Sequence, residues 1–150
     1  MNMGEIKTLV LVYEHSVGNE FVAKPDEEIV ALWKTDRKIK IIGSQICVHI
    51  SDDPLANVSA CAELSLEPRM TIDLYIPGEK SESCRVINHM FLFQQVLTNG
   101  AHHTPRPNIV MFPKGDYITL EKDSTIHLID KADYAGHTGS TWAIVYYLEG

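Results

Sequence analysis

The feature that most constrains this chain is a strict alternation of apolar and polar residues over positions 57–67. Its apolar residues are Val58, Ala60, Ala62, Leu64 and Leu66. Because successive side chains of a β-strand point to opposite faces, such a segment has one dry face and one wet face. Antiparallel sheets that bury a single face are built in this way, so we predict an antiparallel strand here.

Similar alternation recurs later in the chain. The further segments predicted as strands are residues 71–76, 108–112, 117–121, 125–129 and 141–149. Turn residues occupy positions 113–116 and 122–124, and a polar loop is predicted over residues 130–140. Short alternating segments separated by turns are typical of a β-sandwich or barrel. In the last strand, Trp142 and Tyr146 are expected to face the core.

A longer strand is predicted over residues 38–51, and its apolar positions change phase within it. They are odd-numbered at first (Ile39, Ile41) and even-numbered later (Ile46, Val48, Ile50). The change falls at Ile42-Gly43, where a glycine favours a β-bulge or bend. Such a bulge lets one long strand keep its apolar residues on the same side.

Two segments are ambiguous between strand and helix. Residues 25–34 open with Pro25 and three acidic residues, which suits a helix start, yet residues 29–33 also suit a strand. Residues 84–97 fit an amphipathic helix or a strand, and we favour the strand. The prediction for the whole chain is an all-β fold, an antiparallel β-sandwich of the jelly-roll type, with one short helix as the alternative.

The chain is long enough for one domain, residues 1–150, in which residues 1–8 are an extended N-terminal arm that could pair with a neighbour. A formal net charge of −7 and a pI near 5.4 argue against nucleic-acid binding, which depends on clustered cations. The one close basic group is Lys34, Arg37, Lys38 and Lys40. We interpret Lys38 and Lys40 as a solvated strand face that protects a sheet edge.

The cysteines and histidines predict no metal centre. Cys47, Cys61 and Cys84 are widely spaced and interpreted as reduced thiols, with a Cys47–Cys61 disulfide as the alternative. Adjacent His102 and His103 would point to opposite faces of a strand and are assigned to a surface loop. The remaining histidines are His15, His49, His89, His127 and His137.

Carboxylates cluster at residues 26–28, at Asp52-Asp53, and at Asp130 with Asp133. We interpret them as turn residues, with calcium binding as the alternative. No nucleophile elbow or phosphate-binding loop is present, and residues 136–140 are interpreted as a plain loop. We therefore assign no catalytic, cofactor-binding or metal-binding residue and expect a protein that is not an enzyme.

Strand parity predicts that a group of aromatic side chains is exposed and able to stack on sugars or to fill interfaces. These are Trp33, Tyr75, Tyr117, Tyr134 and Tyr147. The apolar run at residues 9–13 is too short for a signal peptide or a membrane span. We accordingly expect no membrane partner and a virion or cytoplasmic location.

The order of strands resembles that of single jelly-roll virion proteins, such as capsid decoration proteins and spike or fibre heads. The likeness lies in residues 30–34 leading into the long bent strand to Ile50, in residues 112–120, and in the final strand from Trp142 to Leu148. It implies a structural virion component that acts through homo-oligomeric contacts, as a trimer or pentamer, and through capsid proteins or surface glycans. No functional residue is carried over from it.

Two other functions are consistent with these residues. The first is a carbohydrate- or ligand-binding β-sandwich module that uses exposed aromatics and acidic loops, with or without calcium. The second is a diverged cupin-like metalloenzyme, although the His-x-His of cupins is missing here.

Overall fold

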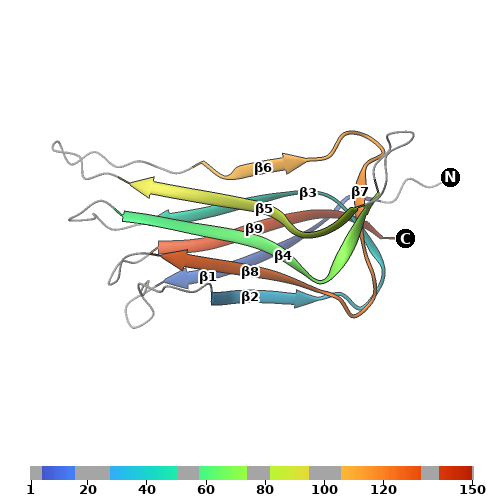
Figure 1. Cartoon of the computed structure of the whole chain (residues 1–150), viewed down its shortest axis with the longest axis horizontal. Coiled ribbons are helices and arrows are strands. Elements are labelled where there is room, and N and C mark those ends of the chain that lie inside the picture. Colours follow the sequence, from blue (N-terminus) through green and yellow to red (C-terminus); the bar gives the residue numbers. More distant parts are fainter. Residues whose placement is uncertain are drawn as a thin grey trace.

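The computed structural model describes residues 5–15, 28–50, 58–73, 82–94, 106–132 and 139–149. These residues form strands and the turns and connections between them, without a helix, and so contain no helix that could cross a membrane (Figure 1). The strands are β1 (Lys7–His15), β2 (Glu28–Lys34), β3 (Ile39–Ile50), β4 (Val58–Asp73), β5 (Glu82–Gln94), β6 (Asn108–Met111), β7 (Tyr117–Leu120), β8 (Thr125–Ala132) and β9 (Gly139–Glu149).

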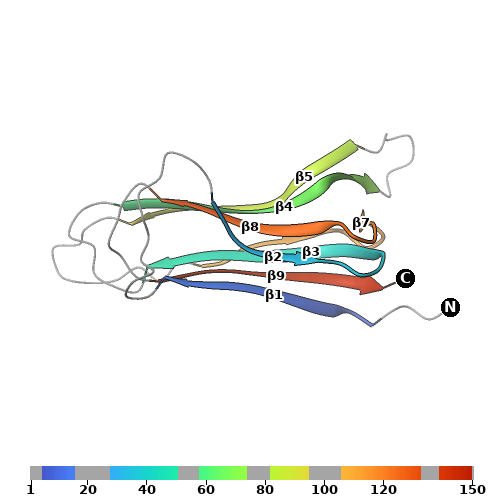
Figure 2. The same cartoon turned by 90° about the horizontal axis from the view of Figure 1, so that it is seen from below.

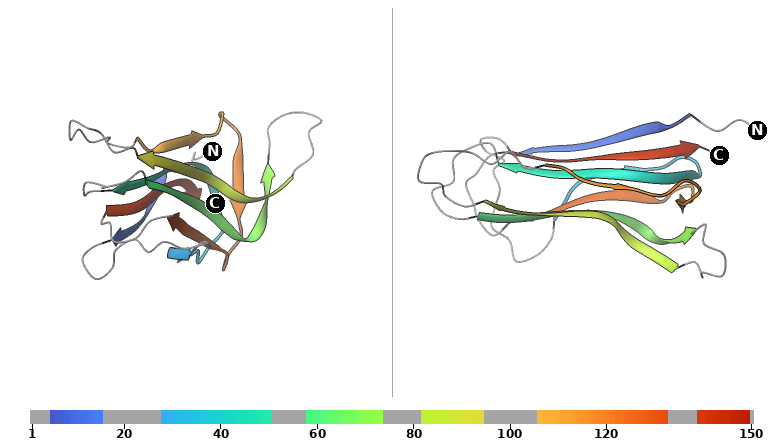
Figure 3. Two further views of the ribbon diagram at one scale, coloured as in Figure 1. Left: turned by 60° about the vertical axis from the view of Figure 1, so that its left-hand side comes forward. Right: turned by 90° about the horizontal axis from the view of Figure 1, so that it is seen from above.

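The strands form two antiparallel sheets packed face to face. The first sheet has the order β1-β9-β3-β6 and the second has the order β2-β8-β4-β5. Short β7 pairs with both β3 and β4 and joins the sheets at one end. Figure 2 and the right-hand view of Figure 3 show the two layers edge-on. Chain order and strand order together are those of a jelly roll, which confirms the predicted fold class.

The core lies between the sheets and is built from the inward residues of each strand. Its buried apolar side chains are Leu11, Ile39, Ile41, Ile46, Val48, Ala62, Leu64, Leu66, Ile87, Met90, Ile118, Leu120, Ile126, Leu128, Ala143 and Val145. The alternation in β4 is confirmed, because Ala62, Leu64 and Leu66 are completely buried. Each fully buried Leu or Ile contributes about 1.5–3 kcal/mol through the hydrophobic effect.

The phase change within β3 is confirmed as a β-bulge. Pairing of β3 with β9 shifts register between Ile41 and Gly43, and the isoleucines on both sides of the bulge are buried. Gly43 is required here because a Cβ atom would lie 2.8 Å from the Val110 carbonyl oxygen of β6. The bulge therefore allows β6 to approach β3 closely.

Both ambiguous segments are strands. The helix alternatives for residues 25–34 and 84–97 are wrong in the described parts, which are β2 and β5. The turns at residues 113–116 and 122–124 are confirmed. In the first, Asp116 N donates to the Pro113 carbonyl across Gly115, whose φ is 97°. In the second, Asp123 adopts a φ of 70°.

The predicted inward face of β9 is wrong. Thr141, Ala143 and Val145 are the buried residues, whereas Trp142 and Tyr146 lie on the opposite face and are half-buried. Trp142 nevertheless packs against the core cluster. Both faces of β9 carry apolar residues, so alternation along this strand could not identify the inner one. The inward-facing positions of β9 hold small side chains because side chains of the opposing sheet already fill the space between the two sheets.

The prediction that Lys38 and Lys40 protect a sheet edge is also wrong. β3 is an inner strand, paired with β9 on one side and with β6 and β7 on the other. Lys40 is half-buried, and its ammonium lies 4.9 Å from the centre of the Tyr117 ring, which gives a cation–π contact.

We predict that Gly43→Ala lowers the free energy of unfolding by about 1–3 kcal/mol, because the added methyl group displaces β6 from β3. Urea denaturation measures the change. Lys114→Ala in the adjoining exposed turn is the control and should stay within about 0.5 kcal/mol of the natural chain. Equal stability of both variants would contradict the role given to the bulge.

Candidate functional site

The outer face of the first sheet is mostly apolar from one edge to the other. Residues directly opposite each other in an antiparallel pair share a face, so the register defines rows across the sheet. One row runs Val10–Ile144–Gln45–Ile109, and another runs Val12–Trp142–Cys47. Cys47 is buried and belongs to the core cluster. We call the following set the apolar outer face: Val10, Val12, Ile109, Met111, Trp142, Ile144, Tyr146 and Leu148.

The outer face of the second sheet is different in character. One of its rows runs Ile29–Ile129–Glu63–His89, and the next contains Leu32, His127 and Ser65. Acidic and imidazole groups therefore interrupt the apolar residues of this face. Ser65 and Ile129 are buried, whereas Val86 and Phe91 on the same face are exposed. The second sheet thus mixes polar and apolar side chains, and the first carries longer apolar rows.

Exposed large apolar side chains gather on the edge strands. Among the described residues they are Ile6, Val10, Val12, Ile29, Leu32, Val86, Phe91, Ile109 and Met111. Apart from Ile6, just before β1, each belongs to one of the four edge strands β1, β2, β5 and β6. Val10, Val12, Ile109 and Met111 belong to the first sheet, and Ile29, Leu32, Val86 and Phe91 belong to the second, so exposed apolar side chains occur on both outer faces.

The apolar outer face ends in a pocket of about 480 Å³. It is lined by Ile6, Ile42, Met111, Phe112, Pro113, Lys114, Gly115, Asp116 and Leu148. Most of this lining is aliphatic or aromatic, with one ammonium and one carboxylate from the turn before β7. Such a lining favours an apolar group over a sugar, whose hydroxyls need several polar partners.

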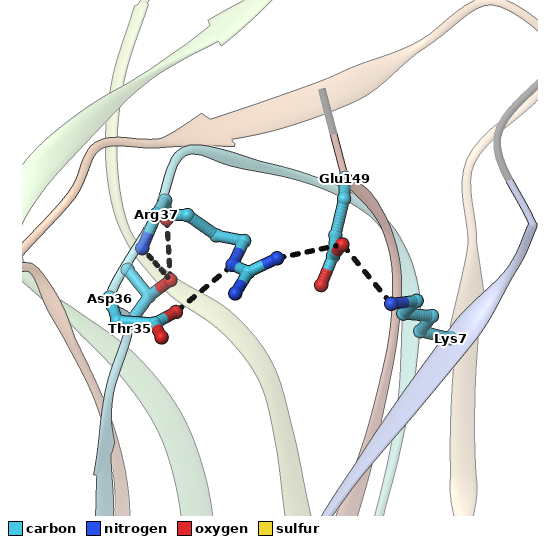
Figure 4. A network of polar contacts seen from close by, with 5 residues as sticks. All are labelled: Lys7, Thr35, Asp36, Arg37 and Glu149. Carbon is cyan, nitrogen blue, oxygen red and sulfur yellow. Dashed lines mark hydrogen bonds and ion pairs between the residues drawn. The ribbon is translucent and has the colours of Figure 1, made fainter.

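An ionic network at the end of the sandwich fastens β1 to β9 (Figure 4). Glu149 Oε2 lies 3.1 Å from Lys7 Nζ and accepts a hydrogen bond from Arg37 Nη1 at 3.2 Å. Arg37 also contacts the Asp36 carboxylate at 3.1 Å. The hydrogen bond from Lys7, followed by the charges of Arg37 and Lys7, lowers the pKa of Glu149, and Arg37 lowers the pKa of Asp36.

A second polar cluster is buried between the sheets. Asp130 Oδ2 lies 2.9 Å from His15 Nε2 and accepts a hydrogen bond from Thr141 Oγ1 at 3.1 Å. Hydroxyl, imidazole and carboxylate are the groups of an acyl-transfer triad, which passes protons through both ring nitrogens. Here the hydroxyl and the carboxylate approach the same nitrogen, and all three side chains are buried. We therefore interpret the cluster as a structural link between β1, β8 and β9.

Side-chain amides of Asn88 in β5 and Asn108 in β6 join the two sheets by hydrogen bonds. The Asn88 side-chain amide donates to the Asn108 carbonyl at 3.0 Å and to Ser44 Oγ at 3.1 Å. The Asn108 amide returns a hydrogen bond to Asn88 Oδ1 at 2.9 Å. Edge strand β5 of the second sheet is thereby held against β3 and β6 of the first.

The sequence-based interpretation of the carboxylates is wrong for Asp130, which lies inside β8 and not in a turn. Its partner His15 is 115 residues away in the chain, so no local spacing could reveal the pair. Residues 26–27, Asp52, Asp53 and Asp133 lie outside the described residues, as do His102, His103 and His137. Within the described ranges, no group of three potential metal ligands comes together.

The cysteine and aromatic predictions have mixed outcomes. Cys47 and Cys61 lie on different sheets and form no disulfide with each other, so the disulfide alternative is wrong, and burial raises the pKa of the Cys47 thiol. Trp33 and Tyr147 are not freely exposed, because both pack against the core with ring centres 6.2 Å apart. Tyr117 is half-buried. The side chains of Tyr75, Cys84 and Tyr134 lie outside the described residues.

We predict that Lys7→Ala raises the pKa of Glu149 toward its ordinary value of 4.5, and that Arg37→Ala raises it less. The lowered pKa stabilises the fold above pH 4.5, and this contribution is lost as the pH falls through the lowered pKa. Titration of the side-chain carboxyl carbon by NMR measures both variants. An unchanged pKa in Lys7→Ala would show that the ion pair is absent in solution.

We predict that Asp130→Ala lowers the free energy of unfolding by about 1–3 kcal/mol, because the buried His15 and Thr141 lose their carboxyl hydrogen-bond partner. Urea denaturation at neutral pH measures the loss. Exposed Glu121→Ala serves as the control, with an expected change within about 0.5 kcal/mol. If Asp130→Ala cost no more than the control, the buried link would contribute nothing to the fold.

Comparison of this chain with models of known protein families, with curated proteins and with solved structures found no match. The argument for function therefore rests on the surfaces and clusters described above. Among these, the two polar clusters are explained by their role in joining strands. The apolar outer face is not explained by the fold of a single chain.

Proposed function

We propose that this protein is a non-enzymatic structural protein that assembles with copies of itself, as a virion component such as a capsid decoration or spike protein. The observation that carries the proposal is the apolar outer face, which spans the first sheet from β1 to β6. In a free chain this face leaves Val10, Val12, Ile109 and Met111 half or more exposed to water. Covering them with another protein surface is the favourable alternative.

The size of the face is informative about the contact it supports. Three strands of roughly 30 Å and the four-residue β6 of roughly 13 Å, spaced about 4.8 Å apart, give a surface on the order of 500 Å². That is near the upper end of what single soluble chains expose. It falls short of the roughly 800 Å² per partner that a stable interface buries. An assembly built on this face therefore needs a second area of contact.

The charge of the chain indicates how assembly responds to salt. With a net charge of −7, copies repel one another at low ionic strength, and added salt screens this repulsion. Burial of apolar surface is not weakened in the same way. Assembly through the apolar outer face should accordingly strengthen as salt is added. Capsid proteins and surface glycans are further proposed partners, with nucleic acid and membranes excluded from the proposal.

We predict that the natural chain forms an oligomer at micromolar concentration and that Ile109→Lys shifts it toward the monomer, because a lysine is placed within the apolar outer face. Light scattering coupled to size-exclusion chromatography measures the mass. Leu32→Lys is a matched control, since Leu32 is 58% exposed and Ile109 is 57% exposed, but Leu32 belongs to the second sheet.

Leu32→Lys should leave the oligomer intact. Two results would contradict the proposal. One is a natural chain that is strictly monomeric under these conditions, and the other is an equal effect of both substitutions, since the first sheet would then have no special role.

A further inference from the structure

We propose that β1 pairs along its free edge with β1 of a second copy, antiparallel and about a two-fold axis that passes through Leu11. This inference rests on the proposed self-assembly and names its second area of contact. In the described part of the chain, β1 pairs with β9 on one side, and no strand pairs with its other side. Figures 2 and 3 show β1 at the outer margin of the first sheet.

Sheet edges normally carry features that prevent pairing with other chains, such as short length, proline, bulges or charges. Three of the four edge strands have them. β6 has only four residues and lies between Pro107 and Pro113, and β5 shifts register against β4 twice. β2 has a bulge between Ile29 and Ala31 and ends in Lys34.

β1 has none of these features along its central part. It runs for nine residues with continuous register against β9. Residues 8–13 contain neither proline nor a charged side chain, and most are aliphatic. An edge of this length and composition is a template for another strand. Among the four edges, β1 is therefore the one open to pairing.

The chemistry of β1 favours a second β1 as its partner. Lys7 stands at its first position and Glu14 near its last. Antiparallel pairing keeps the two Lys7 side chains at opposite ends of the paired strands, and the two Glu14 side chains likewise, whereas in-register parallel pairing would place like charges side by side. A two-fold axis perpendicular to the sheet also keeps every residue on its own face, so the apolar outer faces of the two copies become continuous.

Symmetry and length together fix the register. Directly opposite residues must share a face, so their numbers must both be odd or both be even. Leu11 is the midpoint of Lys7–His15, and placing the axis there pairs all nine residues of each strand. In this register Val10 of one copy lies opposite Val12 of the other, and this contact occurs twice.

The experiment exchanges charges within that contact. Val10→Lys/Val12→Lys sets like charges opposite each other twice, and Val10→Glu/Val12→Lys sets opposite charges there. Like charges directly opposite destabilise a sheet, so the first variant should raise the dissociation constant of the pair roughly tenfold or more. The second variant places the same number of charges on the apolar outer face but pairs them, so it should associate more tightly than the first. Sedimentation equilibrium measures both constants, and circular dichroism confirms the β-fold.

Hydrogen exchange of the natural chain tests the pairing without any substitution. Backbone amides on the free edge of β1 should exchange more slowly as protein concentration rises, because they become hydrogen-bonded to the second copy. Amides of β2, the corresponding edge of the second sheet, are the internal control and should not change. Unchanged exchange of β1 in a chain that self-associates would overturn the pairing.

The outcomes separate this inference from the proposed function. If the natural chain associates and the two double variants behave alike, whether both impaired or both unaffected, β1 pairing is wrong while self-assembly stands. If the natural chain is a monomer at every concentration tested, both the β1 pairing and the proposed self-assembly are wrong. Loss in the Lys/Lys variant with tighter association in the Glu/Lys variant supports the pairing and its register.

Discussion

Burial of aliphatic side chains between the two sheets is the interaction on which the rest of this structure depends. The inner strands β3, β4, β8 and β9 each commit alternate residues to it, and Ile46, Leu64 and Leu128 are completely buried there. Once the inward positions are fixed, the pleat of each strand sends the remaining side chains to the outside. The fold therefore leaves the two outer faces free to differ, and it is on these faces that this chain carries its most specific chemistry.

The two outer faces differ in how polar side chains are distributed among apolar ones. On the second sheet, Glu63 and His89 lie opposite each other among apolar neighbours, of which Phe91 is 67% exposed. On the first sheet, Ile144 lies between Val10 and Gln45 in a row with little polarity. The ion pair between Lys7 and Glu149 fastens the end of β1 to β9. The centre of β1 carries no charged side chain. An uncharged edge beside an apolar face is what an assembling subunit requires.

Alternation and turn chemistry were enough to predict the strands from β3 onward and the bulge, because both are local, whereas β1 was not predicted as a strand and β2 was left open between helix and strand. Gly43 was found from a change of phase, and the structure gives its reason in the close approach of β6. The local pattern failed in β9, where both the odd-numbered and the even-numbered residues are apolar. There Ala143, and not Trp142, faces inward. The local pattern also failed for Asp130, whose meaning depends on a histidine brought from the other end of the chain by topology. The failure at β9 is itself informative, since a strand with two apolar faces is expected only where the outer one is also covered.

The central claim is that the first sheet is an assembly surface, and sedimentation velocity of the natural chain over a series of protein and salt concentrations tests it most directly. The account predicts a sedimentation coefficient that rises with protein concentration and rises further with salt, as repulsion between chains of net charge −7 is screened. A single species of 16.9 kDa at every concentration of protein and salt would contradict it.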